Sequence, residues 1–148
     1  MTNGIMTTVL GRVPETGSGE ALRVLVADRS PHFRETLRRV ITHHPRCKVI
    51  GEAATLLNAA RVATNGDPHI VLLDVDLVLN ESPARLRRLA DAFPHLRIIV
   101  MLNEESLQYR RAVAERWGYV CVVKDQAEVD LDRILGSEAA STPASGGA

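Results

Sequence analysis

The chain has 148 residues, of which 45% are hydrophobic and 24% charged, a composition typical of one folded globular domain. Lysine plus arginine and aspartate plus glutamate both number 18, so there is no basic surplus to favour direct nucleic-acid binding. No apolar run reaches the ~20 residues that cross a bilayer, and no secretory signal is recognisable. We therefore expect a cytoplasmic protein with no membrane contact, in which Cys47 and Cys121 are buried free thiols.

The first part of the chain predicts a leader, a strand and a capped helix. Residues 1–20 are rich in glycine and are expected to be flexible. Leu22–Ala27 is an apolar run that predicts a strand. The Ser30-Pro31 pair that follows is typical of a helix start, because serine caps the helix and proline suits its first turn.

A second strand and helix are expected next. The strand is predicted over Lys48–Ala53, near an edge of the sheet. The helix after it is expected to end at Asn65-Gly66. The helix is indicated by the spacing of Leu56, Leu57, Ala60 and Ala63.

The most informative segment is His69–Asp76, which reads HIVLLDVD. Its short, unbroken apolar run predicts a strand buried on both faces, as in the middle of a parallel sheet. The strand ends in Asp74, and Asp76 follows two residues later. In open α/β sheets, ligands and chemistry collect at such strand ends, so Asp74 is the first candidate for a functional carboxylate.

The second half of the chain continues the alternation. A helix is predicted to start at Ser82-Pro83, a strand to span Arg97–Leu102, and a helix to span Glu104–Arg116. A last strand is expected over Tyr119–Val123. A short final helix is expected to include Val129, Leu131, Ile134 and Leu135.

Five strands alternating with five helices predict a parallel sheet covered on both faces, because crossovers between parallel strands are right-handed. The expected fold is a flavodoxin-like, three-layer α/β sandwich over residues 21–136. Residues 137–148 are small and polar and are expected to form a disordered tail.

Charged residues follow three of the predicted strands. Asp28 follows the first, Asp74 and Asp76 the third, and Lys124 the fifth. Because these strand ends lie on one edge of a parallel sheet, we expect the four side chains to converge. The alternative is that they are ordinary solvated charges at strand ends.

Four segments resemble the receiver domain of bacterial two-component response regulators. They are VLVADRSPHFRETLRRVI, KVIGEAAT, PHIVLLDVDL and VVKD, in the family's order and spacing. The resemblance covers residues 22–135 and is closest to receivers that precede a helix-turn-helix output domain. It implies that Asp74 accepts a phosphoryl group from a histidine kinase, that Asp28 helps to hold Mg²⁺, and that Lys124 pairs with the phosphoryl oxygens.

The sequence departs from the family pattern at several positions of this site. Arg29 replaces a second acidic residue, Leu102 replaces the hydroxyl residue that senses the phosphoryl group, and Cys121 replaces the aromatic residue that moves with it. Because leucine donates no hydrogen bond, the usual readout of a phosphoryl group on Asp74 would lack its donor. We expect phosphorylation of Asp74 to be impaired and, with Arg29 in place of an acid, Mg²⁺ binding to be weakened.

Arg29 and Asp76 each leave two interpretations open. The Arg29 side chain either turns to solvent, or lies among Asp28, Asp74 and Asp76 as a fixed cation in place of Mg²⁺. Asp76 either adds a carboxylate to the weakened metal site or faces water.

Four functions remain after these observations. The favoured one is a stand-alone, atypical receiver that acts by binding a protein, either a histidine kinase or a downstream signalling protein, or by forming a homodimer. Trp117, Arg110 and Arg111 are candidate interface residues, although Trp117 could equally pack inward. The second is a working phosphoacceptor receiver, with no catalysis beyond phosphoryl transfer and hydrolysis at Asp74.

The third function is transcription control. Too few residues follow Leu135 to form a helix-turn-helix, so this function would require a partner or a missing output domain. A small-molecule binder on the same fold is a further alternative, although no glycine-rich phosphate loop follows the first strand.

Overall fold

The computed structural model describes residues 21–81, 83–103, 108, 112 and 116–141. Their centre is a five-stranded, all-parallel sheet in the order β2-β1-β3-β4-β5. The flavodoxin-like arrangement expected from the sequence is confirmed, with β2 at an edge. The strands are β1 (Leu22–Ala27), β2 (Cys47–Ala53), β3 (Ile70–Asp74), β4 (Arg97–Leu102) and β5 (Val120–Val123).

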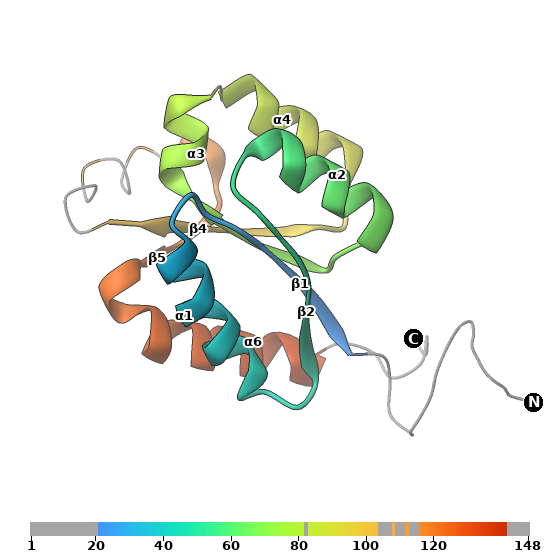
Figure 1. Ribbon diagram of the computed structural model, residues 1–148, viewed down its shortest axis with the longest axis vertical. Helices are drawn as coiled ribbons and strands as arrows, with labels where there is room; N and C mark the ends of the chain where they lie inside the picture. The colour runs from blue at the N-terminus through green and yellow to red at the C-terminus, as the bar shows by residue number, and fades with distance from the viewer. Residues whose placement is uncertain (1–20, 82, 104–107, 109–111, 113–115, 142–148) are drawn as a thin grey trace, which may run out of the picture.

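Helices cover both faces of this sheet. Figure 1 shows α1 (Pro31–Thr42) and α6 (Ala127–Ser141) on one face. The opposite face carries α2 (Leu56–Gly66), α3 (Val75–Asn80) and α4 (Pro83–Ala92). Since side chains alternate along a strand, each face has its own apolar core. Leu25, Leu73 and Leu102 belong to the core under α2, α3 and α4, whereas Val26, Leu72 and Met101 belong to the core under α1 and α6.

Local sequence signals explain where α1 and α2 begin and end. Ser30 caps α1 by accepting a hydrogen bond from the Phe33 amide at 3.1 Å, as the Ser30-Pro31 pair predicted. Thr55 caps α2 in the same way. At the end of α2 the left-handed residue is Asp67, with φ of 49°, rather than Gly66. Asp67 tolerates this conformation better than most residues with a side chain.

The buried faces of α2 and α6 depend on their tertiary neighbours. On α2, Leu57 is 51% exposed and Ala59 is buried. On α6, Val129 is 67% exposed, while Leu131 and Leu135 are buried. In both cases the tertiary neighbours of the helix select a face that apolar spacing alone does not determine.

The main element that the sequence did not predict is α3, which begins at the residue after Asp74. Val75, Leu77 and Val78 are buried in the core beneath it. The final helix is preceded by a 3-10 turn over Lys124–Gln126. It continues through Ser141, past the predicted start of a disordered tail at 137. The predicted leader, the residues after 141 and most of the predicted helix over 104–116 lie outside the described residues.

Candidate functional site

Strand register brings the candidate carboxylates together at one edge of the sheet. Ala27 pairs with Leu73 across β1 and β3, so Asp28 and Asp74 end adjacent strands. On the other side of β3, Asp74 pairs with Met101 of β4. Leu102 in turn pairs with Val123, the residue before Lys124. The predicted convergence of strand ends is therefore present in the structure.

Asp28 and Asp74 are buried charges that share one lysine. Their exposed fractions are 1% and 2%. The Lys124 Nζ lies 2.9 Å from Asp28 Oδ2 and 3.4 Å from Asp74 Oδ1, and 4.6 Å from the centre of the Phe33 ring. Buried carboxylates require such a partner, because an isolated buried charge is strongly unfavourable. Lys124 therefore serves as the shared cation of both carboxylates.

Asp74 also has a structural role as the N-cap of α3. Its Oδ1 accepts a hydrogen bond from the Asp76 amide at 3.1 Å. Asp28 is held in a similar manner, since its Oδ1 accepts from the Ser30 amide at 2.8 Å. Arg34 adds a hydrogen bond of 2.6 Å to the main-chain carbonyl of Asp28. Both carboxylates are thus fixed by the backbone of the segment that follows them.

Arg29 points toward the carboxylates rather than away from them. Its Nη2 lies 3.3 Å from Asp76 Oδ2, and its Nε lies 3.9 Å from Asp74 Oδ2. The same Asp76 oxygen accepts a hydrogen bond of 3.1 Å from Asn103 Nδ2. Asp76 therefore links the loop after β1 to the loop after β4, and it does not simply face water.

Burial and the neighbouring charge of Asp28 raise the pKa of Asp74, against the opposing effect of Lys124. Because the pKa of Asp74 is higher in the folded than in the unfolded protein, its protonated carboxyl group favours folding at low pH. This contribution of Asp74 to stability is lost as the pH rises through the unfolded-state and folded-state pKa values. At neutral pH the ionised Asp74 therefore disfavours folding.

We expect Asp74→Asn to raise the free energy of unfolding at neutral pH, and this advantage to shrink as the pH is lowered. Asparagine keeps an oxygen to cap α3, and Lys124 keeps Asp28 as a partner. Urea denaturation at several pH values measures the effect. The exposed Asp125→Asn is the control and should change little. A destabilised Asp74→Asn protein at neutral pH would show that Asp74 is stabilised, not penalised, by its surroundings.

The donor set fits Mg²⁺ poorly. The Asp28 oxygens contact Lys124 and the Ser30 amide, and the Asp74 oxygens contact Lys124, Arg29 and the Asp76 amide. Among the described residues, no group of three His, Cys, Asp or Glu side chains is arranged to hold a metal ion. Mg²⁺ requires near-octahedral oxygen ligands, and these carboxylates, already in contact with cations and amides, do not form such a site.

The two positions expected to read out the site are apolar and packed. Leu102, the last residue of β4, is 0% exposed and belongs to the same core as Val75 and Val78 of α3. The Cys121 side chain is half-buried against that core, and its thiol donates to the Tyr119 carbonyl at 3.6 Å. Neither residue places a hydroxyl or an aromatic ring beside Asp74.

The predicted interface residues have different outcomes. Trp117 is half-buried against the core and tilted over Tyr119, with ring centres 6.3 Å apart. It lines a hollow of about 500 Å³ beside α4, so it packs inward and is also partly open to solvent. Arg110 and Arg111 lie outside the described residues.

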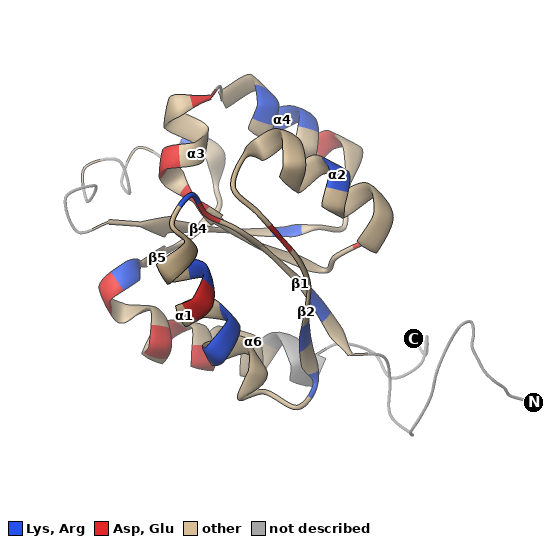
Figure 2. Cartoon of the chain, viewed as in Figure 1, with Lys and Arg blue, Asp and Glu red and all other residues tan. Residues whose placement is uncertain are grey.

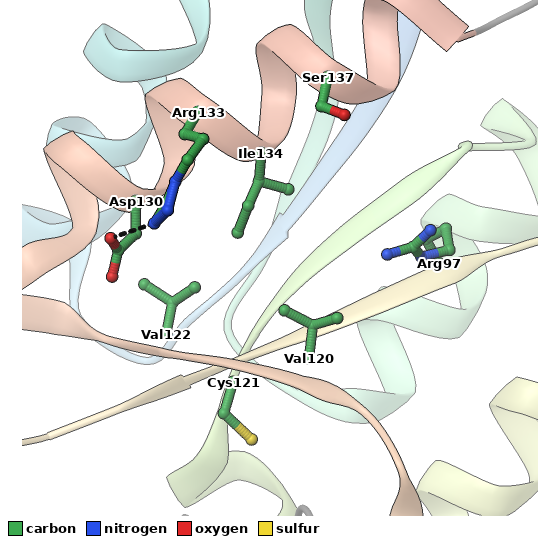
Figure 3. A pocket seen from close by; sticks show the side chains of 8 residues that line it. All are labelled: Arg97, Val120, Cys121, Val122, Asp130, Arg133, Ile134 and Ser137. Atoms are coloured by element: carbon green, nitrogen blue, oxygen red, sulfur yellow. Dashed lines mark hydrogen bonds and ion pairs between the residues drawn. The ribbon is translucent and has the colours of Figure 1, made fainter.

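A second hollow lies beside the edge strand β5 and is distinct from the Asp74 site. It measures about 450 Å³. Figure 3 shows Ile134 and the Asp130–Arg133 ion pair on α6 facing Val120 and Val122, while the Cys121 sulfur points the other way. This alternation places Cys121 on the α4 side of the sheet. Asp28, Asp74 and Lys124 do not line this hollow.

Sequence reasoning missed three contributors to the site. Asn103 binds Asp76, Arg34 binds the Asp28 carbonyl, and the Phe33 ring lies under Lys124. Only Asn103 carried a usable signal, because it is a polar residue directly after a buried strand. The other two lie on α1, where their spacing resembles that of ordinary helix residues.

A comparison with protein-family models decides the family. The model of the response regulator receiver domain matches residues 24–135. The chain belongs to this family. Solved receivers have the same fold. A LuxR-family response regulator from Aurantimonas sp. SI85-9A1 has a TM-score of 0.69 and 24% identity, over 82% of this chain and 86% of that one.

A second solved receiver also has this fold, and sequence relatives match the chain over part of their length. The response regulator domain of Thermotoga maritima CheB has a TM-score of 0.66 and 23% identity, over 84% of this chain and 100% of that one. The transcriptional regulatory protein DegU of Brevibacillus brevis is 22% identical over 86% of this chain, which spans 52% of its length. A protein-glutamate methylesterase/protein-glutamine glutaminase of Pyrococcus abyssi is 31% identical over 52% of this chain, but only 21% of its own length is matched. The likeness to that enzyme therefore involves a limited segment.

Proposed function

We propose that this chain is a stand-alone, atypical receiver in two-component signalling that acts by binding a protein partner. In this proposal phosphorylation of Asp74 is impaired and does not set the conformation of the domain. The supporting observation is the buried Leu102. Leu102 ends β4, one residue after Met101, the partner of Asp74, and opposite Val123, the residue before Lys124. In this proposal a phosphoryl group on Asp74 would find no hydroxyl donor at position 102.

A receiver that lacks a hydroxyl donor at position 102 can still bind a protein partner through its surface. Val120 is exposed on the edge strand β5, and Trp117 and Tyr119 line the hollow beside α4. Aromatic side chains that are partly buried are frequent anchors of protein interfaces. The partner in this proposal is a histidine kinase or a downstream signalling protein, and a second copy of the chain is another candidate. The proposed location is the reducing cytoplasm, where the free thiols of Cys47 and Cys121 would persist.

The test is the response of the protein to Mg²⁺ and beryllofluoride, a mimic of the phosphoryl group. We expect the amide NMR signals of β4, β5 and Lys124 to stay in place when both are added to the folded protein. Shifts throughout β4 and β5 that disappear in Asp74→Asn would show that the site binds the mimic and transmits its presence. Such a result would refute the proposal in favour of a working phosphoacceptor.

A second candidate is the receiver part of a longer transcriptional regulator. It is favoured by the similarity to DegU, about half of whose length this chain spans. The mass of the protein isolated from its native cells separates the two candidates. A mass well above the 16.2 kDa of this chain would support the longer regulator.

Helices of the described part are too short or too polar to cross a membrane.

A further inference from the structure

Arg29 brings a positive charge to a place where the family resemblance implies an acidic metal ligand. It directly follows the buried Asp28, in the segment between β1 and the cap of α1. Its side chain is 53% exposed, so nothing in its burial forces it to turn inward. It nevertheless lies against two carboxylates of the site.

The contacts of Arg29 are those expected of a bridging cation. Its guanidinium reaches Asp76 Oδ2 at 3.3 Å and Asp74 Oδ2 at 3.9 Å. Guanidinium groups suit this task, because their donors are fixed in a plane and can serve two acceptors at once. Arg29 thereby connects the end of β1 with the first turn of α3.

Lys124 and Arg29 together offset most of the negative charge of the three carboxylates. Lys124 serves Asp28 and Asp74 on one side, and Arg29 serves Asp74 and Asp76 on the other. Three carboxylates and two cations leave a single negative charge. A divalent cation entering this cluster would have to displace or repel a guanidinium, which costs Coulomb energy even in water.

We infer that Arg29 takes over the electrostatic role of the metal ion. It balances Asp74 and Asp76 and holds the loop after β1 against the first turn of α3 without Mg²⁺. The inference deepens the proposed function, since a site occupied by a fixed cation would have one conformation before and after exposure to a phosphodonor. The inference concerns cation binding alone, so it can be wrong while the proposed function is right.

The test is a Mg²⁺ titration of the full chain and of Arg29→Asp, with no phosphodonor present. Thermal unfolding and titration calorimetry report the binding. We expect the midpoint of wild-type unfolding to be unaffected by millimolar Mg²⁺. Arg29→Asp should be stabilised by Mg²⁺ and bind it at least about tenfold more tightly, a difference that calorimetry resolves.

Two further variants keep the test decisive. Arg29→Gln removes the guanidinium without adding a negative charge to the cluster. It should therefore show a smaller gain in Mg²⁺ affinity than Arg29→Asp. If Arg29→Asp does not fold, the Mg²⁺ affinity of Arg29→Gln tests the inference. Arg88→Asp makes the same charge reversal on the exposed face of α4, which carries several arginines (Figure 2), and should leave Mg²⁺ affinity unchanged.

Two outcomes would overturn the inference. One is a wild-type protein that binds Mg²⁺ as tightly as Arg29→Asp, and the other is a pair of folded Arg29 variants that gain no affinity. The proposed function is judged separately by the beryllofluoride spectrum. Mg²⁺ binding to the wild type with an unchanged spectrum would reject only the inference about Arg29. A changed wild-type spectrum together with the expected Mg²⁺ gain in Arg29→Asp would reject only the proposed function.

Discussion

Lys124→Met is expected to lower the free energy of unfolding by about 3 kcal/mol at neutral pH, because it leaves buried carboxylates without their cation. The Lys124 ammonium lies 2.9 Å from Asp28 and 3.4 Å from Asp74, and both acids are buried. Methionine preserves much of the side-chain length over Phe33, so loss of packing contributes little. Urea denaturation measures the difference.

The chain offers a matched control for this prediction. Lys48 is exposed on β2, and Lys48→Met should change stability by no more than about 0.5 kcal/mol. Adding Asp74→Asn to Lys124→Met should recover part of the loss, since one of the two unpaired charges is then removed. If Lys124→Met is as stable as the wild type, Lys124 does not neutralise this cluster.

Leu102→Thr should be the second large effect, with a loss of about 3 kcal/mol in the free energy of unfolding. The substitution removes apolar volume from a fully buried position and places a hydroxyl in the core that includes Val75 and Val78. Both changes are unfavourable, the first through a cavity and the second through burial of a polar group. Chemical denaturation and the thermal midpoint measure the loss.

Leu102→Val separates the two causes, because valine has nearly the shape of threonine without its hydroxyl. It should cost about 1 kcal/mol, so that the remaining ~2 kcal/mol of the threonine effect belongs to the hydroxyl. Equal stabilities of the valine and threonine variants would mean that the hydroxyl finds a partner there. The site would then already be suited to a hydroxyl residue, contrary to the proposed function.

The parallel sheet was predictable because its strands are short, continuous apolar runs. Ile70–Asp74 is buried at every residue, which only a central strand covered on both faces allows. The start of α1 was also predictable, since Ser30 and Pro31 are chemically suited to it. These features depend on local composition, and the tertiary fold agrees with them.

The helix α3 could not be predicted in the same way. It has six residues, and Val75, Leu77 and Val78 continue the apolar character of the strand before it. The helix forms because the Asp74 side chain caps it and its apolar residues are buried in the core under α2 and α4. A capping aspartate that also ends a strand gives no distinct pattern in the sequence.

At the site, the sequence predicted which residues converge but left open which side chains meet. Strand ends of a parallel sheet must share one edge, so the meeting of Asp28, Asp74 and Lys124 followed from topology. The direction of Arg29 did not, because a long, half-exposed side chain has many rotamers. Its position beside Asp76 depends on α3 and on Asn103, neither of which the pattern predicted.

The amide spectrum of wild-type protein with Mg²⁺ and beryllofluoride, recorded beside that of an Arg29→Asp, Leu102→Thr double variant, is the most direct test. The account predicts unchanged β4 and β5 signals in the wild type. It predicts shifts in the double variant, where an acid and a hydroxyl are restored. Wild-type shifts equal to those of the double variant would contradict it, because they would show that a site with Arg29 and Leu102 still binds and transmits a phosphoryl mimic.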